Sequence, residues 1–145
     1  MTRYVALLAL VLFAMACGQK QQTAADSGVG EELATVDEGL VAELVEGRTA
    51  EVMVDFGDVE LRSVVSKTIS VVNATDEPIV LLDFETTCRC TTLEFDHRPI
   101  GVGESRDITL TFDSRGEWGG IGNFLSVETS NEECALVVWM SAYIE

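Results

Sequence analysis

The chain has 145 residues, of which 25 are acidic and 9 are basic, so its net charge is −16 at pH 7. No block of basic residues occurs, which argues against nucleic acid as a partner because phosphate binding depends on clustered Lys and Arg. The same charge would repel an anionic membrane surface. The acidity is typical of a well-hydrated surface, and no Asp-x-Asp-x-Asp-Gly loop indicates a calcium site.

Residues 1–16 have the layout of a secretory signal peptide: Arg3 near the start, an apolar run over 5–13, and the small-residue exit Ala14-Met15-Ala16. The apolar run is shorter than the ~20 residues that a transmembrane helix needs. Export would place the chain in an oxidising compartment, where thiols can pair.

Cys17, between Ala16 and Gly18, resembles the cysteine of the bacterial lipoprotein lipobox, with Ala14 in place of the usual leucine. The resemblance implies that the leader is cut before Cys17 and that its thiol carries the lipid that holds the protein to a membrane. An ordinary signal peptide followed by a chance cysteine is the alternative. The expected location is therefore the bacterial cell envelope, with attachment to the outer membrane on its periplasmic or surface face.

Residues 17–48 are predicted to form a lipidated tether and a short helix. The stretch 18–30 is polar, small and Gly-rich, as flexible linkers are. Thr35 and Glu38 fit a capping box, and apolar residues from Leu40 to Val45 then fall roughly on one face before Gly47. This helix would pack on the following domain or remain marginally stable.

Residues 49–145 have the rhythm of strands and turns. Strands are predicted over 50–57, 66–73, 79–87, 91–95, 106–113, 121–129 and 134–144. Seven short strands in ~100 residues predict an all-β, immunoglobulin-like sandwich. The break in alternation near Leu82 and Asp83 predicts a β-bulge. The positions predicted to face inward are Val54, Phe56, Ile69, Val71, Ile79, Leu81, Ile108, Leu110, Phe112, Val127, Val137 and Trp139.

A set of short motifs in this domain resembles the bacterial domain-of-unknown-function family 1573 (DUF1573), which is similar in turn to immunoglobulin-like domains of cilium and flagellum proteins and to sperm-protein-like modules. The most specific of these is Cys-x-Cys-Thr after the third predicted strand. Two positions depart from the family pattern: Arg89 replaces a glycine, and Val102 replaces a proline. The resemblance implies the sandwich and an envelope setting, but no catalytic or ligand residues. The motifs are Phe56-Gly57, Ile69-x-Val71-x-Asn73, Pro78-Ile-x-Leu81, Cys88-x-Cys90-Thr91 and Gly103-Glu104-Ser105.

Cys88, Cys90 and Cys134 remain when Cys17 is set aside, so at least one has no partner within the chain. In an immunoglobulin-like sandwich the third, sixth and seventh strands share a sheet. Cys88 ends the third and Cys134 begins the seventh, which places them about 20 Å apart at opposite ends of that sheet. A disulfide needs Cα atoms within about 7 Å, so Cys134 is predicted to pair with neither of the others.

Cys88 and Cys90 admit three interpretations: a disulfide that locks the turn, reduced residues that only pack, or paired thiolates that hold a soft ion such as Cu(I). Arg89 favours a reactive pair, since a nearby cation lowers a thiol pKa. No cofactor is predicted.

Candidate catalytic groups are sparse. His97 is the only histidine, and a solvent-facing position near the Cys134 end is predicted for it, away from Cys88 and Cys90. Glu94 and Asp96 would share a strand face, but the sequence around them indicates a solvated strand end and no enclosed pocket. The chain is therefore predicted not to be an enzyme.

Trp118 lies in a Gly-rich loop, where it would either cap the open end of the sandwich or anchor a partner. The sequence thus predicts a membrane-anchored, non-enzymatic envelope module that binds a protein partner. The alternative is a periplasmic soft-metal or thiol-redox protein that uses Cys88 and Cys90.

Overall fold

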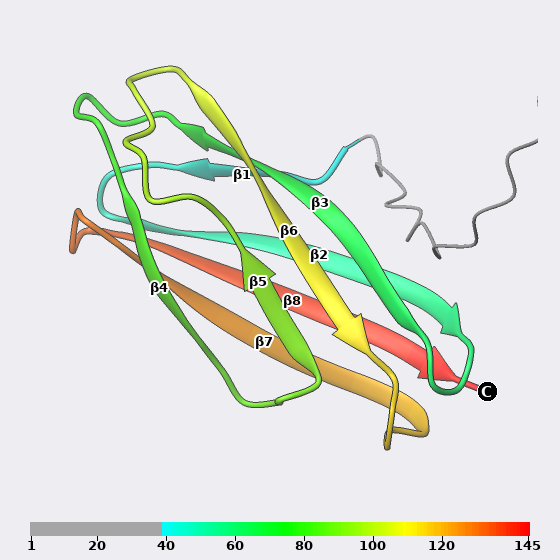
Figure 1. The fold of residues 1–145 in the computed structure, drawn as a ribbon. Coiled ribbons are helices and arrows are strands. Elements are labelled where there is room, and N and C mark those ends of the chain that lie inside the picture. The colour runs from blue at the N-terminus through cyan, green and yellow to red at the C-terminus, as the bar shows by residue number, and fades with distance from the viewer. Residues whose placement is uncertain (1–38) are drawn as a thin grey trace, which may run out of the picture. The chain divides into compact units, whose positions relative to one another are not determined.

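The computed structural model describes residues 39–145, which fold into two facing β-sheets (Figure 1). This part of the chain contains no helix, and hence none long and apolar enough to cross a bilayer. The strands are β1 (Val41–Leu44), β2 (Arg48–Val59), β3 (Val64–Asn73), β4 (Leu81–Thr86), β5 (Thr91–Glu94), β6 (Ser105–Asp113), β7 (Gly119–Thr129) and β8 (Cys134–Ile144).

One sheet has the strand order β1-β3-β6-β5 and the other β2-β8-β7-β4. Neighbouring strands are antiparallel except for β1 with β3 and β2 with β8, which run parallel. The expectation that the third, sixth and seventh predicted strands share a sheet is confirmed, since these are β4, β7 and β8. The register of β4 on β7 shifts between Leu81 and Asp83, which confirms the predicted bulge.

The strand connections define two ends of the sandwich. The Cys134 end holds the β1–β2, β3–β4, β5–β6 and β7–β8 connections, and the Cys88 end holds the β2–β3, β4–β5 and β6–β7 connections. This arrangement puts Cys88 and Cys134 at opposite ends of their sheet, as the strand directions require.

The core lies between the sheets and is built from alternate residues of each strand, including the fully buried Ile69, Leu110, Phe112 and Leu125. All but three of the predicted inward residues are buried. Phe56 is half-buried and packs on Phe112 with ring centroids 5.9 Å apart.

The predicted register of β8 was wrong. Leu136, Val138 and Met140 are the buried residues, so Val137 and Trp139 face outward, and Trp139 is 43% exposed. Apolar residues occupy both parities of this strand, so the alternation that normally fixes which face is buried gives no signal here.

The predicted helix was also wrong within the described residues, and its capping box at Thr35 and Glu38 lies outside them. Residues 41–44 form β1, in which Ala42 and Leu44 are buried and Val41 is exposed. The strand continues the sheet beside β3, and backbone bonds from Ser70 N to Leu40 O and from Ala74 N to Leu44 O, both 2.9 Å, hold it there. Its carbonyls thereby gain partners in β3, and this tertiary pairing overrides the weak local helical pattern.

Asn73 is a buried polar residue that holds the connections at the Cys134 end together through hydrogen bonds. Its side chain has no exposed area, and its Nδ2 donates to Glu77 O (2.8 Å) and Ile100 O (2.9 Å). Its Oδ1 accepts from Thr75 N (3.0 Å) and Thr75 Oγ1 (2.7 Å). A buried amide satisfied at both atoms fixes the β3–β4 turn.

Candidate functional site at the Cys88 end

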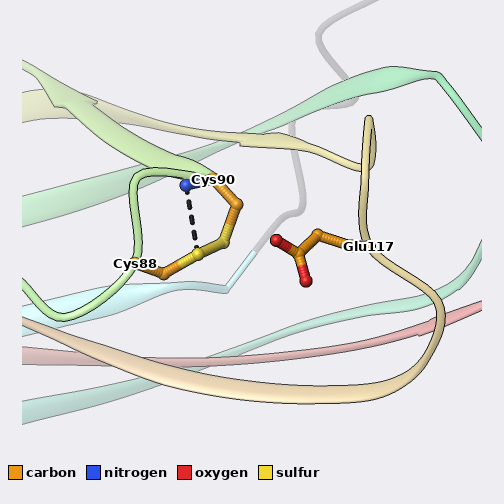
Figure 2. A group of neighbouring side chains, drawn as sticks. All are labelled: Cys88, Cys90 and Glu117. Carbon is orange, nitrogen blue, oxygen red and sulfur yellow. Dashed lines mark hydrogen bonds between the residues drawn. A yellow bond between two sulfur atoms is a disulfide. The ribbon is translucent and has the colours of Figure 1, made fainter.

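The β4–β5 turn brings Cys88 and Cys90 together as a disulfide with a Cα–Cα distance of 5.2 Å (Figure 2). Both residues are half-buried. Cys90 N donates to Cys88 Sγ at 3.1 Å, and Cys90 O accepts from Asp113 N at 2.8 Å, which ties the turn to the end of β6.

Arg89 sits in this turn without backbone strain. Arg62, at φ 61°, is the one non-glycine residue with positive φ in residues 39–145. Arginine at position 89, where the family has glycine, therefore needs no left-handed conformation. Its side chain is exposed.

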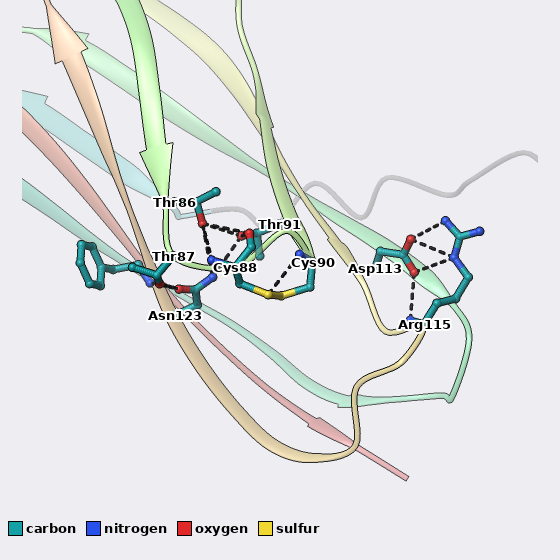
Figure 3. The surroundings of a disulfide bond; sticks show 9 residues. Thr86, Thr87, Cys88, Cys90, Thr91, Asp113, Arg115 and Asn123 are labelled. Atoms are coloured by element: carbon teal, nitrogen blue, oxygen red, sulfur yellow. Dashed lines mark hydrogen bonds and ion pairs between the residues drawn. A yellow bond between two sulfur atoms is a disulfide. The ribbon is translucent and has the colours of Figure 1, made fainter.

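Asn123 on β7 joins the turn to the sheet through a buried polar network (Figure 3). Its Nδ2 donates to Thr91 Oγ1 at 3.2 Å, and its Oδ1 accepts from Phe124 N at 2.9 Å and from the Thr87 hydroxyl. The Thr86 and Thr91 hydroxyls are 3.0 Å apart and both contact Cys88 O at 3.2 Å. Because these groups satisfy one another, the turn has a single well-defined arrangement.

Glu117 is the residue at this end that sequence reasoning missed. It lies on the β6–β7 loop, and its carboxylate points toward the disulfide (Figure 2). Ligand atoms of Cys88, Cys90 and Glu117 lie within 4.8 Å of one another, and within residues 39–145 no other such group of potential metal ligands occurs. The usable signal was topological, since β6–β7 and β4–β5 connections fall at the same end of a sandwich of alternating strands.

The same loop carries an ion pair between Asp113 and Arg115 (Figure 3). Arg115 Nε lies 2.9 Å from both carboxylate oxygens, and Arg115 N donates to Oδ1 at 3.0 Å. These hydrogen bonds lower the pKa of Asp113 to about 2, so the carboxylate is charged at neutral pH. The pair lies just before Glu117 and Trp118 in the chain.

Trp118 follows Glu117 and is 81% exposed. The interpretation that it caps the open end of the sandwich was therefore wrong, and the indole projects into solvent. Phe112 and Phe56 supply the aromatic packing near this end instead.

The other candidates lie away from this site. His97 is exposed, and its Nδ1 donates to Leu81 O at 3.0 Å at the Cys134 end, as the predicted placement required. Asp96 pairs with Arg98 (2.6 Å) and Arg106 (2.9 Å). Its pKa falls to about 2, chiefly through the Arg98 hydrogen bonds, so this carboxyl is charged at neutral pH.

Cys134 is buried and unpaired. Burial, together with the nearby charges of Glu46 and Glu133, raises the pKa of its thiol. A protonated, buried thiol is chemically unreactive. The structure thus brings Cys88, Cys90 and Glu117 together, with Trp118 next to Glu117 on the same loop, and leaves His97 and Cys134 at the other end. Cys17 lies outside the described residues.

The two four-stranded sheets define an all-β sandwich of the immunoglobulin-like class. The family model "Protein of unknown function (DUF1573)" matches residues 48–144, and the chain belongs to that family. No curated protein matches this sequence.

Two solved structures share the fold. A protein of unknown function from Porphyromonas gingivalis W83 is 15% identical with a TM-score of 0.55. The match covers 75% of this chain and 50% of the Porphyromonas protein, so this chain spans about half the length of that protein. The ASH/PapD-like domain 7 of human CEP192 is 9% identical with a TM-score of 0.55, over 88% of this chain and 98% of that domain. At these identities the likeness concerns the fold alone.

Proposed function

We propose that the protein is a non-enzymatic interaction module of the bacterial cell envelope, held to a membrane by a lipid on Cys17 and presenting one sandwich domain to a protein partner. The observation that carries the proposal is Trp118. A side chain that is normally buried is 81% exposed here, on a loop next to a turn fixed by a disulfide and a polar network.

An exposed tryptophan on an ordered support is suited to recognition. Trp is enriched among residues that dominate binding energy, because it contributes a large contact area with few rotatable bonds. The fixed turn beside it reduces the ordering cost of binding.

Membrane attachment and partner binding are tested separately. For attachment, mass spectrometry of the mature N-terminus is expected to show an acylated Cys17, and Cys17→Ser is expected to release the protein from membranes. An unmodified N-terminus with unchanged fractionation would contradict this part.

For partner binding, purified protein is used as bait against solubilised envelope proteins. We expect captured proteins that are lost with Trp118→Ala and kept with Val102→Ala. Val102 is the matched control because it is also exposed, at 56%, but lies at the Cys134 end. Capture that is insensitive to Trp118→Ala would contradict the role of this residue.

The second candidate, a soft-metal or thiol-redox protein, gains one specific observation. Glu117 adds an oxygen donor beside the two sulfurs, which could bind a metal only after the disulfide is reduced. A carboxylate is a harder ligand than Cu(I) prefers, whereas Zn²⁺ accepts both sulfur and oxygen. Titration of the reduced protein with each metal, compared with Cys88→Ser and Glu117→Gln, tests this function; binding equal to that of Cys88→Ser would exclude it.

A further inference from the structure

The outer face of the β2-β8-β7-β4 sheet carries a row of large apolar side chains. The register places Met53 beside Trp139, and Trp139 beside Phe124. Met53 is 79% exposed, Trp139 43% and Phe124 40%, and the two rings lie 5.3 Å apart, tilted by 44°. A contiguous exposed apolar row of this kind marks an interaction site more often than scattered single residues do.

Small residues beside this row create a hollow of about 560 Å³. The next row is Asp55, Ser141 and Gly122, in register across the same three strands. A Cβ atom added at Gly122 would meet no atom within 4 Å. The missing side chain at Gly122 and the short one at Ser141 therefore leave space beside Trp139 and Phe124, which also line the hollow.

Acidic residues border the apolar row on both sides. Asp55 lines the hollow itself. On the other side, the row Glu51, Val137, Ser126 and Glu85 places a carboxylate at each margin of the sheet. The four strands of this sheet contain one basic residue, Arg48 at the start of β2, against six acidic residues: Glu51, Asp55, Asp58, Asp83, Glu85 and Glu128.

Asp55 is held in its ionised form. Its Oδ1 accepts from Gly57 N at 3.0 Å and from Ser141 Oγ at 2.9 Å. These two hydrogen bonds, with a smaller contribution from the charge of Lys67 on β3, lower the pKa of the carboxyl. The hollow thus combines aromatic faces, a flexible thioether and a fixed negative charge.

We propose that this hollow binds a segment of a partner protein in which an arginine or lysine side chain is flanked by apolar residues. The cation would lie against the ring faces of Trp139 and Phe124, as cation–π contacts require, with Asp55 as its counter-charge. Met53 would adapt to the neighbouring apolar side chains. This inference rests on the proposed function and names the chemistry of the partner.

The shape of the site favours a protein segment over a free small molecule. Small-molecule sites enclose most of their ligand's surface, whereas Met53, at 79% exposure, leaves this hollow open to solvent. A second copy of the chain is disfavoured as occupant, because it would present the same acidic face and like charges repel.

The test uses two capped peptides that differ in one group: a central arginine between two leucines, and the same peptide with neutral citrulline. The protein carries Trp118→Phe, so Trp139 becomes its single tryptophan reporter. We expect the arginine peptide to shift Trp139 fluorescence with saturation and to bind about tenfold more tightly than the citrulline peptide. Equal binding of both peptides would overturn the cationic chemistry.

The location is tested with Gly122→Val. The glycine has an ordinary φ and open space around its Cβ position, so valine fits the strand and fills the hollow while every aromatic residue remains. We expect binding at least about fivefold weaker, and unchanged binding for Gly120→Val, whose Cβ would only touch Tyr143 at 3.9 Å outside the hollow. Unchanged affinity of Gly122→Val would place the peptide elsewhere.

Three further outcomes would also overturn the inference. Concentration-dependent dimers that Gly122→Val abolishes would make a second copy the occupant. Loss of binding with Glu94→Gln, an acid on the other sheet, equal to the loss with Asp55→Asn would show attraction to the overall charge only. Failure of both peptides to bind, with capture of a partner through Trp118 intact, would reject the hollow and leave the proposed function standing.

Discussion

The two ends of the sandwich are closed by different means. At the Cys134 end, Asn73 is fully buried and makes four hydrogen bonds, and Cys134 is buried with a protonated thiol. At the Cys88 end, the disulfide cysteines are only half-buried and Trp118 is exposed. The first end is closed by buried polar and thiol groups, whereas the second is closed by a disulfide and carries the exposed indole of Trp118. Under the proposed function, the Cys134 end contributes stability and the Cys88 end meets the partner.

The largest expected effect comes from disrupting the Cys134 end. Asn73→Ala leaves Thr75 N without a hydrogen-bond partner inside the protein and removes one of the two bonds that Glu77 O and Ile100 O each accept. We expect a loss of about 3 kcal/mol or more in the free energy of unfolding, measured by urea denaturation. The matched control is Asn131→Ala, whose side chain accepts one exposed bond from Glu133 N and should cost about 1 kcal/mol or less. Equal losses for the two would show that burial at this end carries no special weight.

A smaller effect is expected from removing the covalent closure. The Cys88–Cys90 disulfide spans a sequence separation of 2, and a loop this short restricts the unfolded chain little. The double variant Cys88→Ala/Cys90→Ala should lose about 1–2 kcal/mol in the free energy of unfolding under the same conditions. A loss as large as that of Asn73→Ala would contradict the contrast between the ends.

The Asp113–Arg115 pair offers a pH-dependent test of the Cys88 end. The pKa of Asp113 lies at about 2 in the folded protein, below its usual value of about 3.9. The stability it contributes is therefore present above about pH 4 and lost as pH falls toward 2. Arg115→Gln should return the pKa of Asp113 toward its usual value, measured by NMR titration of the carboxyl. A pKa that stays near 2 would assign the shift to another group.

The smallest effect on stability is expected for Trp118→Ala. Because this side chain is 81% exposed, the free energy of unfolding should change by no more than about 0.5 kcal/mol. A loss of 2 kcal/mol or more would show that Trp118 packs on the sandwich and would restore the capping role that the sequence favoured.

Sequence reasoning succeeded where the apolar residues of a strand lie on one face only. Strand β6 carries apolar residues at every second position, Ile108, Leu110 and Phe112, so the pattern alone predicts both the strand and its buried face. It failed at β8, where Val137 and Trp139 are as apolar as their buried neighbours. That failure concealed the outer apolar row, which is the basis of the further inference.

Three other features could not be predicted from local sequence. Residues 41–44 become a strand only because β3 offers a free edge to pair with. Glu117 lies beside Cys88 because the β4–β5 and β6–β7 connections, which are distant in sequence, meet at one end of the sandwich. Asn123 likewise looks like an ordinary polar strand residue until the β4–β5 turn packs on it.

The central claim, that this is an interaction module whose Cys88 end meets the partner, is tested most directly by photo-crosslinking in intact cells. A photoreactive amino acid replaces Trp118 in one strain and Val102, exposed at the opposite end, in the other. We predict a discrete crosslinked protein from position 118 and none from position 102. Equal crosslinking from both positions, or none from position 118 while position 102 captures a protein, would contradict the claim.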